Sequence, residues 1–210
     1  MMTEHPPTRR PTRIVVGVSG ASGARYATRL LELLLERSIE VHLVVTDYGK
    51  RLLADELGIT SLSLDTLCPD LAGSPNSQAI RDLLFVHPHK DVGAVIASGS
   101  FLHDGMVVIP CSSTSLGKIA TGSGGNLLTR AAAVTLKERR DLILVHRESP
   151  LSLIDIENMR TLSLAGATIA PANPGLYLKP TTVDEIIDFT VGKVLDLLKI
   201  EHDLKIRWER

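Results

Sequence analysis

The sequence predicts an α/β fold in three layers, with one mainly parallel sheet covered by helices on both faces. Short runs of apolar, largely β-branched residues alternate along the chain with longer helical patterns. These runs are apolar nearly throughout, which is typical of strands buried on both faces of a sheet. Because crossovers between parallel strands are right-handed, the carboxyl ends of the strands are expected at one edge, where such folds bind ligands.

Composition excludes several classes of protein. With 210 residues, of which 44% are hydrophobic, the chain fits one domain with a sizeable core. Its net charge of -1 gives no general attraction to nucleic acid or anionic lipid, and its aromatic content of 3% argues against a surface that stacks bases. Two cysteines, Cys68 and Cys111, suggest no disulfide framework and a cytoplasmic location. We expect neither a signal peptide in the polar residues 1–13 nor a membrane span.

The first strand, predicted at 14–18, leads into a turn of small residues at 19–23. Glycines in this turn allow the backbone to approach a ligand closely. The helix expected at about 24–37 points its free N–H groups and the positive end of its dipole at the turn. Ser19 and Ser22 add hydroxyl groups, so the turn favours phosphate binding over packing alone, although G-x-S-G-A-S-G does not match the dinucleotide fingerprint.

The second strand is predicted at 41–45 and is followed by a helix at about 50–57. Thr46 stands at the carboxyl end of that strand, where a ligand group is expected. Glu56 lies near the C-terminus of the helix, where the dipole disfavours a carboxylate. A surface glutamate without a role is the commoner case, but this unfavourable placement points mildly to a site.

The middle of the chain contains a hydroxyl-rich segment after a buried strand. Residues 61–89 are poorly periodic and predict loop, short helix and a short strand, and the small residues at 97–101 could close over a pocket. The run at 105–109 predicts a buried strand, with a helix expected at about 116–120. Capping a helix needs only one hydroxyl, so ligand contact is favoured for this set, which comprises Ser112, Ser113, Thr114 and Ser115. Cys111 could be a nucleophile, but a buried role is favoured because no histidine is near in sequence.

A helix capped by Asn126 is expected to run to about residue 139. Arg130 and Lys137 are seven residues apart, so they lie on one face of this helix. A solvated, basic helix end explains this segment equally well.

The next buried strand, at 142–145, is followed by Arg147 and Glu148 on the ligand edge of the sheet. A helix is expected to open at Ser149 and Pro150 and to continue to about residue 165. A short strand at 167–170, a loop at 171–180 and a long amphipathic helix at 183–200 complete the predicted elements. No metal site is expected, because the histidines are scattered and none pairs with a cysteine at zinc-like spacing.

Five motifs resemble those of the flavin prenyltransferases, the UbiX-type enzymes grouped with aromatic-acid decarboxylase subunits. They are S-G-A-S-G-A-x-Y at 19–26, P-C-S at 110–112, L-K-E-R-R at 136–140, V-x-R-E-x-P at 145–150 and G-x-Y-x-x-P at 175–180. The resemblance covers 13 to about 200, and chance agreement of all five motifs in order is implausible. It implies a Rossmann-like flavoprotein fold.

The resemblance also implies a reaction. A dimethylallyl group leaves its (mono)phosphate without the help of a metal and is joined to N5 and C6 of reduced FMN. The product, prenylated FMN, serves a separate UbiD-type decarboxylase. The family further implies a homododecamer with sites at subunit junctions. The residues themselves predict a flexible, Pro-containing arm at 1–12 and a charged tail at 201–210 that carries Trp208 and contacts a neighbouring subunit. One flavin-binding domain is expected between them at 13–200.

Site residues are carried over by motif. The resemblance implies contacts to FMN from Gly20, Ala21, Ser22, Thr46, Ser112, Ser113, Thr114, Ser115 and Arg147. It implies contacts to the prenyl phosphate from Arg130, Lys137, Arg147, Glu148, Tyr177 and Lys193. Catalytic roles fall on Ser22 and Glu56, which handle protons at the flavin, and on Lys137 and Glu148 at the leaving phosphate. Lysine at 193 departs from the family's usual arginine, which puts phosphate affinity in doubt, and threonine at 46 is a milder change from serine.

Two other functions fit part of the sequence. An FMN-dependent cysteine decarboxylase of similar fold would share the flavin-binding half but relies on a catalytic histidine and another substrate loop. A non-catalytic flavin carrier, as an accessory subunit of a decarboxylase, would share the flavin contacts and need neither Lys137 nor Glu148. The motifs L-K-E-R-R and G-x-Y-x-x-P favour the transferase.

Overall fold

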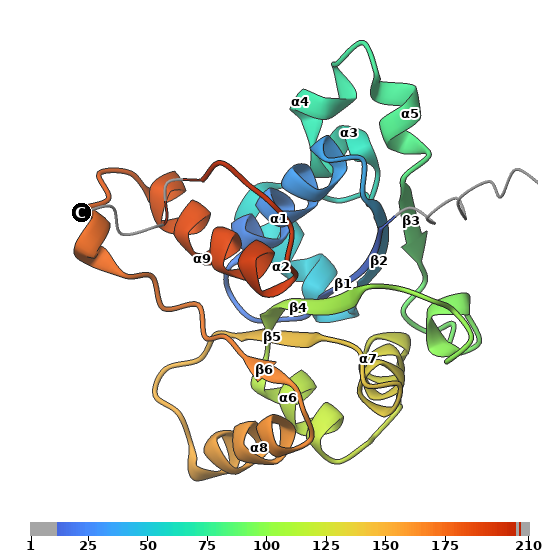
Figure 1. Ribbon diagram of the computed structural model, residues 1–210, viewed down its shortest axis with the longest axis vertical. Helices are drawn as coiled ribbons and strands as arrows, with labels where there is room; N and C mark the ends of the chain where they lie inside the picture. The colour runs from blue at the N-terminus through green and yellow to red at the C-terminus, as the bar shows by residue number, and fades with distance from the viewer. Residues whose placement is uncertain (1–11, 205, 207–210) are drawn as a thin grey trace, which may run out of the picture.

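The computed structural model describes residues 12–204 and 206, and in this part of the chain six strands form one sheet (Figure 1). Every neighbouring pair is parallel, in the order β3-β2-β1-β4-β5-β6. The order runs outward from β1 in one direction and then resumes beside β1 in the other, which creates a switch point between β1 and β4. The strands are β1 (Arg13–Val18), β2 (Glu40–Val45), β3 (Leu84–His87), β4 (Gly105–Cys111), β5 (Leu142–His146) and β6 (Thr168–Ile169).

Helices cover both faces of the sheet, so the predicted three-layer architecture is confirmed (Figure 1). One face is covered by α1 (Ala24–Glu36), α2 (Asp47–Leu57) and α9 (Val183–Leu197). The other face is covered by α6 (Ser113–Ala120), α7 (Leu127–Lys137) and α8 (Leu153–Leu164). Short elements fill the connections: α3 (Leu64–Leu67), α4 (Pro69–Ala72), α5 (Ser77–Arg81) and the 3-10 turns η1 (Val95–Ala97) and η2 (Leu176–Leu178).

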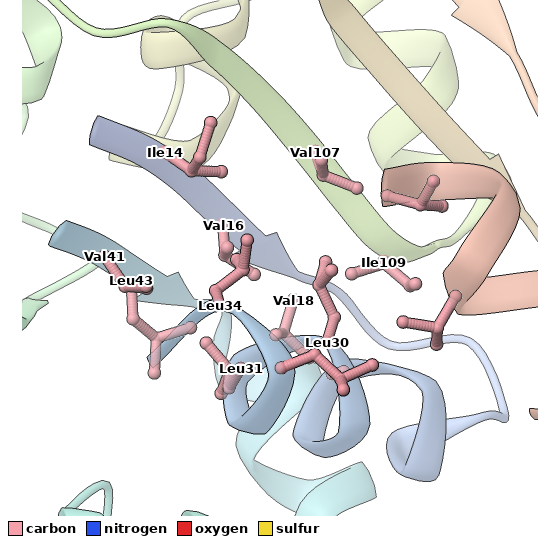
Figure 2. Packing of buried hydrophobic residues seen from close by; sticks show 14 of the residues in the cluster. Ile14, Val16, Val18, Leu30, Leu31, Leu34, Val41, Leu43, Val107 and Ile109 are labelled. Atoms are coloured by element: carbon pink, nitrogen blue, oxygen red, sulfur yellow. The ribbon is translucent and has the colours of Figure 1, made fainter. Parts of the chain in front are cut away.

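The core has two parts, one on each side of the sheet. Alternate residues of β1 point to opposite faces, so Ile14 and Val16 pack against α1 while Val15 packs on the side of α6 and α7. Figure 2 shows the first part, in which Leu30 and Leu34 of α1 meet the strands. Burial on both faces explains why the strands are apolar almost throughout.

Side-chain caps place several helix starts earlier or later than the sequence predicts. Thr46 accepts the N–H of Gly49 and starts α2 at Asp47, three residues before the expected start. The predicted opening of α8 at Ser149 and Pro150 is wrong, because α8 begins at Leu153. Ser152 and Asp155 form a capping box there, in which each side chain accepts the other's backbone N–H.

Part of the predicted organisation falls outside the described residues, namely 1–11 and Trp208. The described end of the predicted tail packs on the same chain, since Ile206 is buried and touches Gly192 of α9. No helix in the described part of the chain has the length and apolar character needed to cross a membrane. The division into arm, domain and tail stays a prediction.

Candidate active site

A cavity of about 610 Å³ lies where several separated segments of the chain meet. Ser22 comes from the turn between β1 and α1, Glu56 from the end of α2, and Arg147 and Glu148 from the segment after β5. All four were predicted as site residues. The parallel topology puts the carboxyl ends of β1 and β5 at one edge of the sheet. Glu56 reaches this edge through its bond to the start of α1.

The carboxylate of Glu56 lies at the N-terminus of α1. It accepts the backbone N–H of Gly23 at 3.1 and 3.2 Å and that of Ala24 at 2.8 Å. A helix leaves such donors unpaired at its start, and the positive end of its dipole stabilises a carboxylate there. The Glu56 carboxylate thus takes the N–H donors that the sequence predicts for a phosphate. A ligand phosphate therefore needs other donors at this edge of the sheet.

The turns after β1 and β4 are bonded to each other through Ser19. This residue is 1% exposed, its hydroxyl donates to the carbonyl of Pro110 at 3.0 Å, and it accepts the N–H of Ser112 at 2.8 Å. Ser112 in turn accepts the N–H of Ser115 at 3.3 Å and caps α6. The prediction that Ser19 offers its hydroxyl to a ligand is wrong, because that hydroxyl is buried and holds two strand ends together.

The remaining residues of the first two turns are closely packed. Thr46 is buried and its hydroxyl caps α2, accepting the N–H of Gly49 at 3.0 Å. Ala21 is also buried. At Gly20 a Cβ atom would stand 2.4 Å from the Cβ of Tyr48, so only glycine fits there. These residues shape the edge of the sheet, and their predicted contacts with FMN stay predictions.

A groove of about 770 Å³ between α6 and α8 adjoins the cavity. Ser113 and Thr114 of the predicted hydroxyl set line this groove. Glu148 lines both the groove and the cavity, so the two spaces meet at its side chain. The hydroxyl set is thus divided, because Ser112 and Ser115 are used in capping while Ser113 and Thr114 face the groove.

Polar side chains of β5, α6 and α8 meet beside this groove. His146 Nε2 lies 3.1 Å from the hydroxyl of Ser113. Hydrogen bonds from Ser113 and then from Ser152 lower the pKa of Asp155 to about 2. Burial lowers the pKa of His146, so its imidazole is neutral at pH 7.

Arg130 and Lys137 line a second cavity, of about 530 Å³. They share one face of α7, as their spacing predicts, and the opposite wall is made by residues 92–99. Lys137 forms an ion pair with Glu138, and this bond lowers the pKa of the Glu138 carboxyl. The described residues therefore bring the basic pair to a pocket of its own, separate from the cavity of Ser22 and Arg147.

Two predicted substrate residues line neither cavity. Tyr177 in η2 packs edge-on against Phe189, with ring centroids 5.8 Å apart. Lys193 is half-exposed on α9, and its Nζ lies 3.8 Å from a carboxylate oxygen of Asp196. Within one chain, these two side chains are not assembled with the remaining predicted site.

The cavity has members that sequence reasoning missed. Tyr26, His146, Met159 and Asn173 line it, yet none was given a role. Tyr26 stands inside the S-G-A-S-G-A-x-Y motif, and His146 directly precedes Arg147. Their places in the sequence, beside predicted site residues, therefore indicate that both lie near the site. Met159 lies in α8 and Asn173 follows β6, so their positions depend on how these two elements pack, which no local sequence pattern indicates.

Cys111 is buried within β4, and burial raises the pKa of its thiol to about 12. The thiol therefore stays protonated, which supports the structural role favoured from the sequence over a nucleophilic one. In the described part of the chain, no group of three or more His, Cys, Asp or Glu side chains could hold a metal ion.

The fold and the edge cavity define a class, the α/β flavoproteins. The family model described as Flavoprotein matches residues 2–195, so the chain belongs to that family. Within it, the chain is a member of the flavin prenyltransferases. It is 45% identical to flavin prenyltransferase UbiX of Halalkalibacterium halodurans over 92% of this chain and 91% of the relative. It is 46% identical to flavin prenyltransferase UbiX of Thermoplasma acidophilum over 93% of this chain and 99% of the relative.

Solved structures agree with this membership. The crystal structure of AnUbiX (PadA1) in complex with FMN and dimethylallyl pyrophosphate matches with a TM-score of 0.82 and 37% identity, over 96% of this chain and 99% of that chain. A dodecameric FMN-dependent UbiX-like decarboxylase from Escherichia coli O157:H7 matches with a TM-score of 0.81 and 39% identity, over 95% and 100%. The cysteine decarboxylase TvaF, at 14% identity and a TM-score of 0.58, shares the fold alone.

Proposed function

We propose that this protein transfers the dimethylallyl group of dimethylallyl phosphate to N5 and C6 of reduced FMN, giving prenylated FMN. The observation that carries the proposal is the cavity in which Ser22, Glu56, Arg147 and Glu148 converge. Two further observations support the proposal. The chain is a member of the flavin prenyltransferases, and a relative of known structure was crystallised with FMN and dimethylallyl pyrophosphate.

The residues present fit a flavin with a phosphate tail. Apolar side chains such as Met159 and Ile187 line the cavity, and they suit a flat ring system. Among the described residues the guanidinium of Arg147 has no carboxylate partner, so it is available to bind phosphate through its fork of N–H donors. Reduced FMN supplies the nucleophilic N5 and C6 atoms when it is bound. The residues proposed to hold it are Gly20, Ala21, Ser22, Thr46, Ser112, Ser113, Thr114, Ser115 and Arg147.

Departure of the prenyl phosphate requires fixed positive charge, because negative charge gathers on the leaving group in the transition state. Arg130 and Lys137 provide two such charges, and Arg147 provides a third. The first two lie in a different cavity from the third within one chain. We therefore propose a homo-oligomer in which neighbouring subunits bring the two cavities together, with Tyr177 and Lys193 completing the substrate site. A UbiX-like relative is described as dodecameric.

Proton transfer falls to the carboxylates of the cavity. Glu148 lies beside Arg147, where it can pass a proton to the leaving phosphate. Glu56 and the exposed hydroxyl of Ser22 line the same cavity and are proposed to handle the protons of the flavin. Glu56 is held in place by two backbone N–H groups, so its carboxylate is oriented before a ligand arrives.

One assay separates the proposal from its alternatives. The protein is incubated anaerobically with reduced FMN and with either dimethylallyl phosphate or dimethylallyl diphosphate. The mass of the extracted flavin is then measured by mass spectrometry. We expect a gain of one prenyl unit. Unmodified flavin with both donors would overturn the proposal and favour a flavin carrier. Release of carbon dioxide from a peptide ending in cysteine, with oxidised FMN, would favour the cysteine decarboxylase instead.

The proposal extends to the fate of the product and to location. Prenylated FMN is expected to pass to a UbiD-type decarboxylase, which uses it as cofactor. A cytoplasmic location is consistent with the two free, buried cysteines. Adding the purified protein's product to a UbiD-type decarboxylase lacking its cofactor is expected to restore decarboxylation, and failure to do so would exclude the hand-off.

A further inference from the structure

The second arginine of the L-K-E-R-R motif, Arg140, is bonded to the loop that faces Lys137. Its Nη1 donates to the carbonyl of Phe101 and its Nη2 donates to the carbonyl of Gly99, both at 2.7 Å. A planar guanidinium that spans two carbonyls fixes both the distance and the angle of the segment between them. The loop at 98–101 is thus attached to the end of α7 by a two-point contact.

The end of α7 fixes Arg140 in turn. The N–H of Arg139 donates to the carbonyl of Leu136, and that of Arg140 donates to the carbonyl of Thr135, at 3.0 Å each. Arg139 has a φ of 56°, and this left-handed residue with the paired bonds forms a Schellman motif. The guanidinium therefore starts from a defined backbone position three residues after Lys137.

The loop is also anchored on its far side. The ring of Phe101 lies edge-on to His42, with centroids 4.7 Å apart, and the guanidinium of Arg13 stands 5.5 Å from the Phe101 centroid. Ser98 and Ser100 are bonded through their hydroxyls at 2.8 Å. With both ends held, the loop presents Ser98 and Gly99 as one wall of the cavity that Arg130 and Lys137 line.

At Gly99 the backbone of this wall lies close to the side chain of Lys137. A Cβ atom at Gly99 would stand 2.9 Å from Nζ of Lys137 and 2.2 Å from Oε1 of Glu138. The loop backbone therefore limits where the Lys137–Glu138 ion pair can lie. If the loop moves outward, the ammonium group gains freedom and spends less time at one position, which weakens its contact with a substrate phosphate.

We propose that Arg140 is a positioning residue for the prenyl donor: through the carbonyls of Gly99 and Phe101 it sets the wall that orients Lys137. This inference rests on the proposed function, in which Lys137 stabilises the leaving phosphate. The substrate affected is the dimethylallyl phosphate and not FMN, because the loop that Arg140 holds lines the second cavity through Ser98 and Gly99 and does not line the first.

The test compares Arg140→Lys with Arg139→Lys in the full-length protein. Both replace an arginine by a lysine in the same motif. Of these two arginines, only Arg140 has side-chain hydrogen bonds to other described residues. Lysine keeps the charge and loses the fork. We expect Arg140→Lys to reduce kcat/KM for dimethylallyl phosphate at least tenfold with an FMN dissociation constant changed less than twofold, and Arg139→Lys to leave both unchanged. Equal effects of the two variants would overturn the inference.

A second set of variants separates positioning from simple loss of structure. In a Lys137→Ala background, Arg140→Lys should have little further effect on kcat/KM, because Arg140 acts through Lys137. Gly99→Ala pushes on the same ion pair from the loop side and should behave in the same way. Multiplying effects in the Lys137→Ala background would overturn the inference. If Lys137→Ala itself left prenyl transfer unchanged, the role proposed for Lys137 would fail, which is a distinguishable result.

Discussion

The carboxylate of Glu56 accepts the backbone N–H of Ala24 at 2.8 Å, so the last turn of α2 supplies the anion at the first turn of α1. Near the C-terminus of its own helix a carboxylate is disfavoured by the dipole, and at the N-terminus of another helix it is favoured. The unfavourable placement seen along the sequence is therefore offset by a tertiary contact. The same contact holds the carboxylate in the candidate cavity.

Glu56→Gln is expected to lower both stability and turnover. Loss of the charge at the start of α1 should reduce the free energy of unfolding by about 1 kcal/mol, as measured by urea denaturation at neutral pH. Turnover should fall because the proposed proton acceptor is removed. Asp55→Asn is the matched control, since Asp55 is an exposed neighbour whose ion pair with Arg51 lies on the surface. Equal destabilisation by the two variants would contradict the helix-start role.

Lys137→Ala is expected to separate catalysis from flavin binding. Removing one fixed charge from the leaving phosphate should reduce kcat/KM by about a hundredfold. The dissociation constant of FMN should change less than twofold, because Lys137 and Arg147 line different cavities within the chain. Fluorescence titration of FMN and the anaerobic prenyl-transfer assay measure the two quantities. Parallel loss of both would mean that Lys137 belongs to the flavin site.

The free energy of unfolding should fall as the pH is lowered from 7 toward 5.5, because of two histidines on the neighbouring strands β2 and β3. His42 Nδ1 lies 2.9 Å from His87 Nε2, and His42 Nε2 lies 2.8 Å from Glu40. Burial lowers the pKa of His42 despite Glu40, and burial together with His42 lowers the pKa of His87. In the unfolded chain these histidines take up protons near their ordinary pKa of 6.5, whereas in the folded chain they stay neutral at the same pH. Lowering the pH through this range therefore favours the unfolded state.

His87→Gln tests this sign. Glutamine can still bond to His42 but does not titrate, so the slope of unfolding free energy against pH between 5.5 and 7 should become shallower. Urea denaturation at several pH values gives the slope for the wild type and the variant. An unchanged slope would show that His87 does not contribute to the pH dependence.

Arg139→Gly is expected to stabilise the protein. Arg139 adopts a φ of 56° at the end of α7, which costs a residue with a side chain about 1 kcal/mol and costs glycine nothing. The melting temperature should therefore rise, with the prenyl-transfer rate unchanged. Arg139→Ala provides the control, because it removes the side chain but keeps the Cβ atom. A similar rise for alanine would trace the gain to charge and not to backbone conformation.

The sequence alone predicts those features that depend on a local pattern of residues, such as buried strands and the faces of helices. Apolar runs located β1, β2, β4 and β5, because strands buried on both faces must be apolar. The spacing of Arg130 and Lys137 placed both on one face of α7, because a helix repeats every 3.6 residues. Helix starts were less accurate, as at Ser152, because several hydroxyls compete as caps and only the backbone geometry selects one.

By itself, the sequence determined a parallel α/β sheet, its ligand edge and membership of the flavin prenyltransferases. Only the tertiary structure decided that the Ser19 hydroxyl donates to the carbonyl of Pro110, which is 91 residues away. It likewise decided that Glu56 accepts the N–H of Ala24 at the start of α1, 32 residues before it in the chain. It also decided that Lys137 and Arg147 line separate cavities. The reason is physical: periodicity and propensity act within a few residues, whereas the partner of a polar group depends on how whole elements pack.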